Sequence, residues 1–211
     1  MKTDELIAFL ARGAGPAPVA PVARRLAPMA LLGLLASAAL ALAVFGPLRA
    51  DTLPPAAVLM KFGYAAALAG AAGWLTARLA RPVARLGAPA RFAASVLLLM
   101  AMLGFVAWLR VTEAERATAL FGSSWLSCPW NVLALSLPAL AGLLWALQGL
   151  APTRLRAAGF AAGVLAGALG ALGYALACPE ASAAFVAVWY TLGILLSGAL
   201  GAWLGPRVLR W

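Results

Sequence analysis

Two cysteines, each followed by proline, are the residues of this sequence with the greatest capacity for chemistry. The segments Cys128-Pro129-Trp130 and Cys178-Pro179-Glu180 both stand just before a long apolar run. Proline suits the first turn of a helix, because its missing N–H group would have no partner there. The N-terminus of a helix also favours a thiolate. We therefore expect two thiols at helix entrances, at matched depth.

This pair of thiols could sense or bind a ligand. Two thiols can form a disulfide outside the cytoplasm. They can also bind a soft metal ion transiently, with Glu180 as a third ligand. The candidate sensing residues are therefore Cys128, Cys178 and Glu180, and no resident cofactor is predicted. Reduced thiols in such loops should be reached by reagents from outside. The alternative is a pair of small buried apolar side chains or a purely structural disulfide.

Other catalytic groups are scarce. The chain contains no histidine and only six acidic residues, which excludes an imidazole base and histidine-ligated metals. The acids Asp51, Glu113, Glu115 and Glu180 show no paired spacing, and no glycine-rich phosphate-binding motif follows a strand. We predict that the protein is not an enzyme.

The composition is typical of a membrane protein. Hydrophobic residues make up 65% of the 211 residues and charged residues 10%, whereas soluble domains carry about 25% charged residues. A helix needs about 20 apolar residues to cross a bilayer core of roughly 30 Å. Six stretches meet this requirement: Leu26–Phe45, Ala57–Ala77, Phe92–Leu109, Val132–Leu150, Ala157–Ala177 and Ala184–Leu204. The predicted fold is all-α, a polytopic bundle of six transmembrane helices (residues 26–211) after a cytoplasmic tail (residues 1–25).

The distribution of positive charge orients this bundle. The formal net charge is +10, but the basic residues lie at helix ends, which argues against direct nucleic-acid binding. If the N-terminus is cytoplasmic, twelve basic residues fall inside and three outside. Basic residues accumulate on the cytoplasmic side of membrane proteins. We therefore predict that both termini are cytoplasmic and that both Cys-Pro segments lie in outer loops.

Three further patterns concern the spans and the outer loop. Lys61 is the only charge inside a predicted span, and because it lies near the outer end we expect its long stem to snorkel to the interface. Small residues recur every four positions, as at Gly159 and Gly163, which predicts close helix packing. The sequence Thr112-Glu113-Ala114-Glu115 predicts a capped helix that continues to about Phe121.

The N-terminal tail predicts a short amphipathic helix. Thr3 or Asp4 can cap it, and Leu6, Ile7 and Leu10 form an apolar stripe. A helix of about ten residues is marginal alone, so this stripe needs a surface to cover it. That surface could belong to a protein partner, to the lipid bilayer or to the bundle itself.

These features together resemble the NrsF-type membrane anti-sigma factors, over essentially the whole chain to about Gly205. The resemblance rests on the initial Met-Lys-Thr-Asp-Glu-Leu-Ile, the six spans, the two Cys-Pro segments and the later Trp189-Tyr190. It implies an inner-membrane protein that sequesters an extracytoplasmic-function sigma factor and releases it under heavy-metal or redox stress. It assigns stress sensing to Cys128 and Cys178. It assigns sigma-factor binding to the following residues of the tail: Lys2, Thr3, Asp4, Leu6, Ile7 and Leu10.

An alternative function is transport of a metal or small solute by Lys61, Glu180 and the thiols. A transporter requires a polar path through several spans, and only Lys61 interrupts the apolar runs. The sequence therefore favours the regulator, whose partners are a sigma factor and the lipid bilayer. The tail has no cysteine or histidine for a zinc-binding domain, so binding would rest on the short helix and the basic inner loops.

Overall fold

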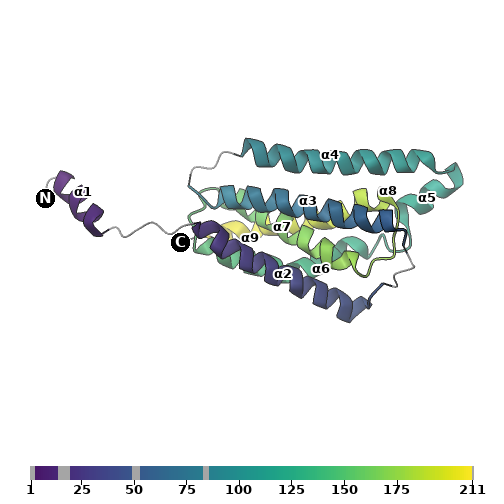
Figure 1. Ribbon diagram of the computed structural model, residues 1–211, viewed down its shortest axis with the longest axis horizontal. Helices are drawn as coiled ribbons and strands as arrows, with labels where there is room; N and C mark the ends of the chain where they lie inside the picture. The colour runs from purple at the N-terminus through teal and green to yellow at the C-terminus, as the bar shows by residue number, and fades with distance from the viewer. Residues whose placement is uncertain (1–2, 14–19, 49–52, 83–85, 211) are drawn as a thin grey trace.

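The computed structural model describes residues 3–13, 20–48, 53–82 and 86–210, and all regular elements within these ranges are helical (Figure 1). In chain order the elements are α1 (Thr3–Gly13), α2 (Pro21–Phe45), α3 (Pro55–Leu79), α4 (Gly87–Arg110), α5 (Glu113–Phe121), α6 (Cys128–Gln148), α7 (Leu155–Ala175), α8 (Ala183–Phe185), the π-helix η1 (Val186–Tyr190) and α9 (Thr191–Val208). Six described segments are long and apolar enough to cross a membrane, the last being α8, η1 and α9 together. The predicted six-span helical fold is confirmed.

The spans run up and down, so that the start of α2 and the C-terminal end of α9 lie at the same end of the bundle (Figure 1). Each spanning helix begins one to five residues before its predicted apolar run, whereas α6 and α7 end two residues before theirs. Pro21 starts α2 and Pro55 starts α3, as expected from the preference of proline for the first helical turn. The opposite end of the bundle carries α5 and the two Cys-Pro segments.

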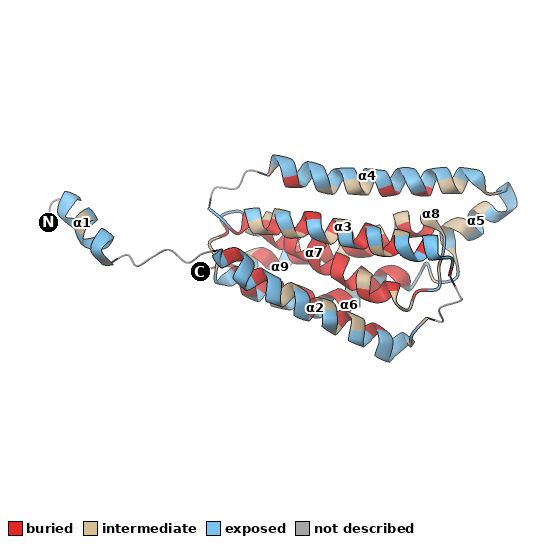
Figure 2. Ribbon diagram, in the orientation of Figure 1, coloured by how far each residue is buried: buried red, intermediate tan, exposed pale blue. Residues whose placement is uncertain are grey.

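The centre of the bundle is α7 (Figure 2). Its residues are buried almost continuously from Ala158 to Ala175, and it packs against α2, α3, α6 and α9. Alanine and glycine make up most of this helix, so four neighbours can approach its backbone. Close van der Waals contact of this kind drives helix association in lipid, where burial of apolar surface gives little advantage.

The tightest of these contacts joins α7 to α9. A Cβ atom added to Gly159 would collide with the carbonyl oxygen of Gly201, and one added to Gly163 would collide with that of Ser197. The relation is reciprocal, because a Cβ atom on Gly201 would collide with the carbonyl oxygen of Gly159. The close packing predicted from the four-residue spacing is therefore confirmed.

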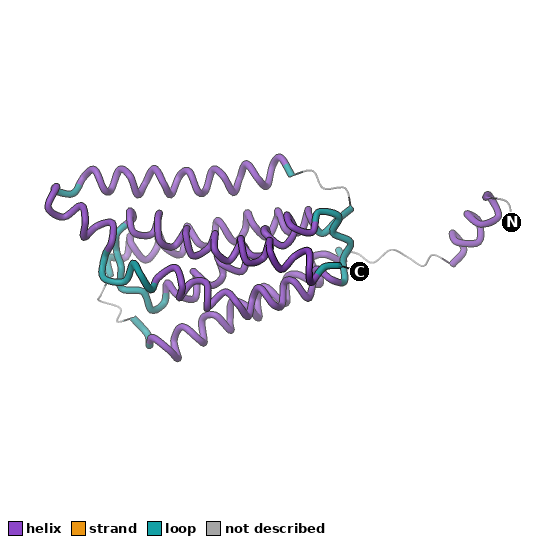
Figure 3. The backbone as a smooth tube through the Cα atoms, turned by 180° about the vertical axis from the view of Figure 1, so that it is seen from behind, coloured by secondary structure: helices purple, strands orange, loops and turns teal. Residues whose placement is uncertain are grey.

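By contrast, α4 lies at the edge of the bundle in both views (Figures 1 and 3). Within the described range 86–210, the buried residues of α4 are Pro89, Met100 and Gly104. Gly104 is the point at which α4 meets the last span, since a Cβ atom there would lie 2.6 Å from Cβ of Ala187. Ala93, Val96 and Leu97 are partly buried against the core, and most of the other α4 residues are exposed.

The end of the bundle opposite the C-terminus is covered by α5, which confirms the predicted helix in this loop. The Thr112 hydroxyl donates to the Glu115 carboxylate at 2.9 Å, but the Thr112 side chain makes no capping hydrogen bond to the helix backbone, so the predicted capping box is not formed. The indole N–H of Trp189 donates to the Leu120 carbonyl oxygen at 2.8 Å and ties α5 to η1. The π-helix itself was not predicted; such segments add a residue to a turn and are frequent at functional sites.

The α7–α9 contact gives a direct test of the packing. We expect Gly163→Ala to lower the free energy of unfolding by about 1–3 kcal/mol, because the added methyl group must push the two backbones apart. Thermal unfolding of the purified protein in detergent measures this change. Gly70→Ala is the matched control, since nothing lies within 4 Å of its added Cβ atom. Equal stability of the two variants would contradict the observed backbone contact.

Candidate functional site

The two thiols lie inside the protein at the end of the bundle that α5 covers. Cys128 and Cys178 are both free cysteines, and both are 0% exposed. Our expectation that external reagents reach them is therefore wrong. Cys128 opens α6, as predicted, whereas Cys178 follows the C-terminal end of α7, where its N–H group donates to the Tyr174 carbonyl oxygen at 2.9 Å. The thiolate-favouring position at a helix N-terminus thus applies to Cys128 alone.

Lys61 of α3 is buried beside Cys178. Its side chain is 0% exposed, and its ammonium group donates to the backbone carbonyl oxygen of Cys178 at 2.8 Å. The predicted snorkelling to the interface is therefore wrong. The Glu180 carboxylate lies within electrostatic range of Lys61. A charge removed from water needs compensating groups of this kind, and charges inside membrane helices mark functional sites by default.

A second polar contact links α3 to the last span one helical turn from Lys61. The hydroxyl groups of Tyr64 and Thr191 lie 2.6 Å apart and share a hydrogen bond. Thr191 immediately follows the π-helix η1. Lys61 and Tyr64 together hold α3 against the elements that carry Cys178 and Tyr190.

Tyr190 lies near both thiols. Its side chain is 0% exposed, and within the described residues its hydroxyl is one of two buried side-chain polar atoms without a hydrogen-bond partner. It lies within electrostatic range of Cys178 and Cys128, and its ring packs against that of Tyr174 at 5.8 Å. An unsatisfied polar group in an interior is costly, so the Tyr190 hydroxyl needs an explanation beyond packing.

Glu180 joins the two Cys-Pro segments. Its Oε1 atom accepts hydrogen bonds from the Ser123 N–H at 2.8 Å, the Ser123 hydroxyl at 2.7 Å and the Ser124 hydroxyl at 3.1 Å. The turn that precedes Cys128 is thereby fastened to the loop that carries Cys178. Gly122 permits this turn, because its φ is +54° and a Cβ atom there would collide with the carboxylate.

This position of Glu180 differs from the predicted role as a third metal ligand. Among the described residues, no group of three His, Cys, Asp or Glu side chains is placed to hold a metal ion. The Cys128–Cys178–Glu180 ligand set is therefore not assembled in this conformation. Transient binding of a soft metal by the two thiols alone stays a prediction.

The sequence grouped Lys61 with Glu180 and the thiols only under the transport alternative, and it predicted no role for Tyr190. A lone charge within a span was a usable signal for Lys61, but its position near the helix end favoured the interface. In the sequence, Tyr190 contributed only to the family resemblance, as part of Trp189-Tyr190. The position of Tyr190 depends on the π-helix η1, and no local pattern in the sequence predicts a π-helix there.

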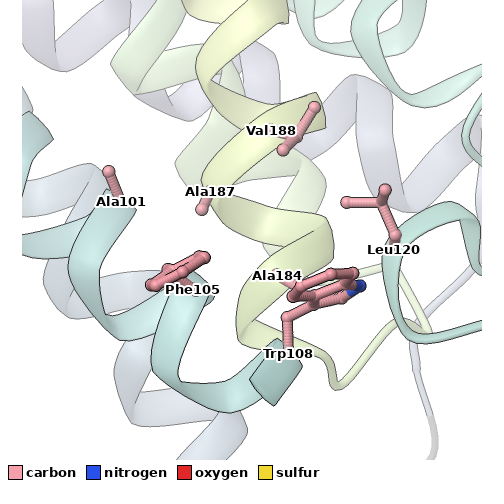
Figure 4. A pocket seen from close by; sticks show the side chains of 8 residues that line it. Ala101, Phe105, Trp108, Leu120, Ala184, Ala187 and Val188 are labelled. Carbon is pink, nitrogen blue, oxygen red and sulfur yellow. The ribbon is translucent and has the colours of Figure 1, made fainter. Parts of the chain in front are cut away.

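An apolar hollow of about 260 Å³ lies between α4 and the last span (Figure 4). Phe105 and Trp108 of α4 face Ala184, Ala187 and Val188 across it. The labelled side chains present carbon apart from the ring nitrogen of Trp108. This hollow therefore offers apolar packing and no reactive group.

The predicted docking helix is also present. Helix α1 begins at Thr3, so Asp4 lies with Glu5 in the first turn, and Lys2 lies outside the described residues. The apolar side chains are exposed: Leu6 is 41%, Ile7 60%, Phe9 72% and Leu10 61% exposed. Figure 2 shows almost the whole helix as exposed surface. The stripe predicted to need a covering surface is thus available to a partner.

Comparison with known proteins identifies the family. The family model described as "Negative regulator of sigma F" matches residues 10–211. The chain belongs to this family. The chain is similar to the probable anti-sigma-F factor NrsF of Azospira oryzae and to the anti-sigma-F factor NrsF of Caulobacter vibrioides. Each is 40% identical to this chain, over 216 and 221 residues respectively, with 100% of both chains covered. No solved structure matches.

This membership in the negative regulator of sigma F family confirms the resemblance seen in the sequence. The matched region contains the whole bundle and therefore Lys61 and both Cys-Pro segments. Most of α1 precedes residue 10 and lies outside the family model, although both relatives align with the full chain.

The burial of the thiols can be measured chemically. We expect a membrane-impermeant maleimide to leave native protein unmodified and to add two labels after denaturation, since both thiols are fully buried. An Ala117→Cys variant is the control, because Ala117 is exposed on α5 and should give one label in intact cells. Mass spectrometry counts the labels. Fast labelling of native wild-type protein would contradict the burial of Cys128 and Cys178.

Proposed function

We propose that this chain is a membrane anti-sigma factor that sequesters a sigma factor of the extracytoplasmic-function class. The observation that carries the proposal is the full-length 40% identity with the anti-sigma-F factor of Caulobacter vibrioides. The exposed apolar face of α1 supports it, because an amphipathic helix is a recurrent means of docking into an apolar groove of a partner protein.

We further propose that the protein lies in the cell inner membrane with both termini in the cytoplasm. The twelve-to-three distribution of basic residues supports this orientation. The bundle end at which α2 begins and α9 ends carries Arg24, Arg25, Arg207 and Arg210. In this orientation α1 faces the compartment that contains sigma factors.

Stress sensing at Cys128 and Cys178 is the second part of the proposal. A soft divalent cation would bind the two sulfur atoms and displace their protons, and an oxidant would accept two electrons as the disulfide forms. Either reagent must first enter a site in which both thiols are fully buried. Reaction at the thiols therefore favours a conformation in which the outer packing has opened, and differential binding shifts the population toward it.

The contacts around the thiols give a route by which that opening could reach the cytoplasmic end. Glu180 fastens the turn before Cys128 to the loop of Cys178, and Lys61 fastens that loop to α3. A change at the thiols would strain both hydrogen bonds. Because α3 is a continuous helix from Pro55 to Leu79, displacement of its outer end moves its inner end as well.

Transport of a metal or solute is the alternative function. Five polar residues of the described spans are fully buried: Ser37, Lys61, Thr76, Ser136 and Ser197. The serine and threonine hydroxyls among them bind backbone carbonyl groups or one another, as in the 2.6 Å hydrogen bond between Ser136 and Ser197. Lys61 is the charged residue of this set. These isolated contacts favour the regulator over a polar transport path.

Docking by α1 has a sharp test. We expect Leu10→Ala to weaken sigma-factor binding by about 2 kcal/mol, the size typical of an interface anchor, which is roughly a 30-fold rise in Kd. Leu10→Glu should abolish binding and leave sigma-dependent transcription active without stress. Ala8→Glu is the matched control, because it adds the same charge to the opposite side of the helix.

Binding is measured by titrating the purified sigma factor against the full chain in detergent. The docking interpretation fails if deletion of residues 2–12 leaves the captured sigma factor bound. It also fails if Ala8→Glu and Leu10→Glu weaken binding equally, since the apolar stripe would then not be the surface that binds the sigma factor.

The sensing role has a separate test. We expect Cys128→Ser and Cys178→Ser, alone or combined, to abolish the transcriptional response to chromate or cadmium, because a pair requires both sulfur atoms. Each variant should still reach the membrane and still bind the sigma factor. A sigma-dependent reporter gene measures the response. A normal response in the double variant would show that the thiols are only structural.

A further inference from the structure

We propose that the inner end of α7 and α9 binds the headgroup of an anionic phospholipid. A hollow of about 580 Å³ opens there on the side of the bundle. It is lined by Arg156, Ala202, Trp203, Pro206, Arg207 and Arg210. Among the described residues that line it, arginine is the only charged type, so the site carries three positive charges.

Arg207 is held in place for such a ligand. Its Nη1 atom donates to the Trp203 carbonyl oxygen at 2.8 Å, and its guanidinium carbon lies 4.2 Å from the centre of the Trp203 ring. A guanidinium group has five N–H donors in a planar fork, so one bond to a carbonyl leaves others for phosphate oxygens. The side chain therefore loses little freedom when a phosphate binds.

The N-terminus of α7 adds to the positive potential. Arg156 is the second residue of this 21-residue helix, and the side chain of the N-cap residue Arg154 makes no capping hydrogen bond. The first N–H groups of a helix attract anions, and phosphate groups bind at helix N-termini for this reason. The helix terminus and the three guanidinium groups thus favour the same kind of ligand.

The remaining lining favours a lipid over a free phosphate or an acidic protein. Trp203 is 56% exposed and, with Ala202 and Pro206, gives the hollow an apolar wall. Tryptophan is enriched at membrane interfaces, where its ring lies at headgroup level. A phospholipid has a negative headgroup for the arginines and acyl chains for this wall, and basic hollows on the cytoplasmic side of membrane helices recruit anionic lipids.

The site is held in a defined shape. The Gln148 side chain of α6 donates to the Val208 carbonyl oxygen at 2.8 Å, which fixes the C-terminal end of α9 against the bundle. The backbone contact at Gly159 and Gly201 fixes α7 against α9 at the same depth. This inference depends on the orientation of the bundle and not on sigma-factor binding.

The chain contains a matched control for the test. Arg78 lies over the ring of Trp74 at 5.9 Å, with the same four-residue spacing as Arg207 and Trp203. Arg78 is also at the inner end of its helix. It does not line the hollow. Replacement of Arg78 therefore removes an equivalent charge without altering the proposed site.

The experiment is native mass spectrometry of the full chain in detergent, titrated with phosphatidylglycerol or phosphatidylcholine. We expect wild-type protein to bind phosphatidylglycerol with preference. The triple variant Arg156→Gln, Arg207→Gln, Arg210→Gln should bind it on the order of 10–100-fold more weakly, and Arg78→Gln should bind it like wild type. Arg210→Gln alone, at an exposed position, should weaken binding several-fold if the triple variant does not fold.

Three results would overturn the proposal. The first is equal binding of the two lipids by wild-type protein. The second is equal loss in Arg78→Gln and the site variants, which would indicate a general effect of net charge. The third is a triple variant that binds phosphatidylglycerol as tightly as the wild-type protein does but binds the sigma factor more weakly. That result would assign this basic surface to the protein partner.

Discussion

The backbone contact between α7 and α9 is the constraint on which the rest of this structure depends. Glycines at four-residue spacing let the two helices meet without intervening side chains, as at Gly159 and Gly201. In lipid, close van der Waals packing between helices takes the place that burial of apolar surface has in water as the main source of association energy. It places α7 at the centre, and α2, α3 and α6 then surround it. Lys61 of α3, Cys128 of α6 and Cys178 after α7 thereby lie near one another at the end of the bundle that α5 covers.

That region is a buried polar cluster within an otherwise apolar bundle. Lys61 is compensated by the carbonyl oxygen of Cys178 and by electrostatic interactions with nearby groups, while the Tyr190 hydroxyl makes no hydrogen bond among the described residues. Without water, polar groups in such a place must satisfy one another or remain costly. In the proposed function, a ligand or oxidant that reacts with the thiols would change this balance and favour a second conformation.

The two ends of the molecule differ in a way that fits a membrane regulator of the sigma F family. At the outer end, Glu180 and Trp189 bind the covering loop to the spans, and the reactive groups are buried. Beyond the inner end, α1 presents Ile7 and Leu10 to its surroundings. In the proposed function, the covered end holds the sensing thiols, α1 binds the sigma factor, and the six spans connect the two parts.

The sequence by itself determined the features that depend on local pattern. These are the six spans, the helix after Thr112, the close-packing glycine spacing and the apolar stripe of α1; each follows from composition or periodicity within one segment. The tertiary structure decided where Lys61 and Glu180 bind, that Cys128 is buried, and that Tyr190 lies in a π-helix. These outcomes depend on contacts between residues more than 50 positions apart, such as Lys61 with Cys178. No periodicity within a single helix specifies which distant polar group will satisfy a buried charge.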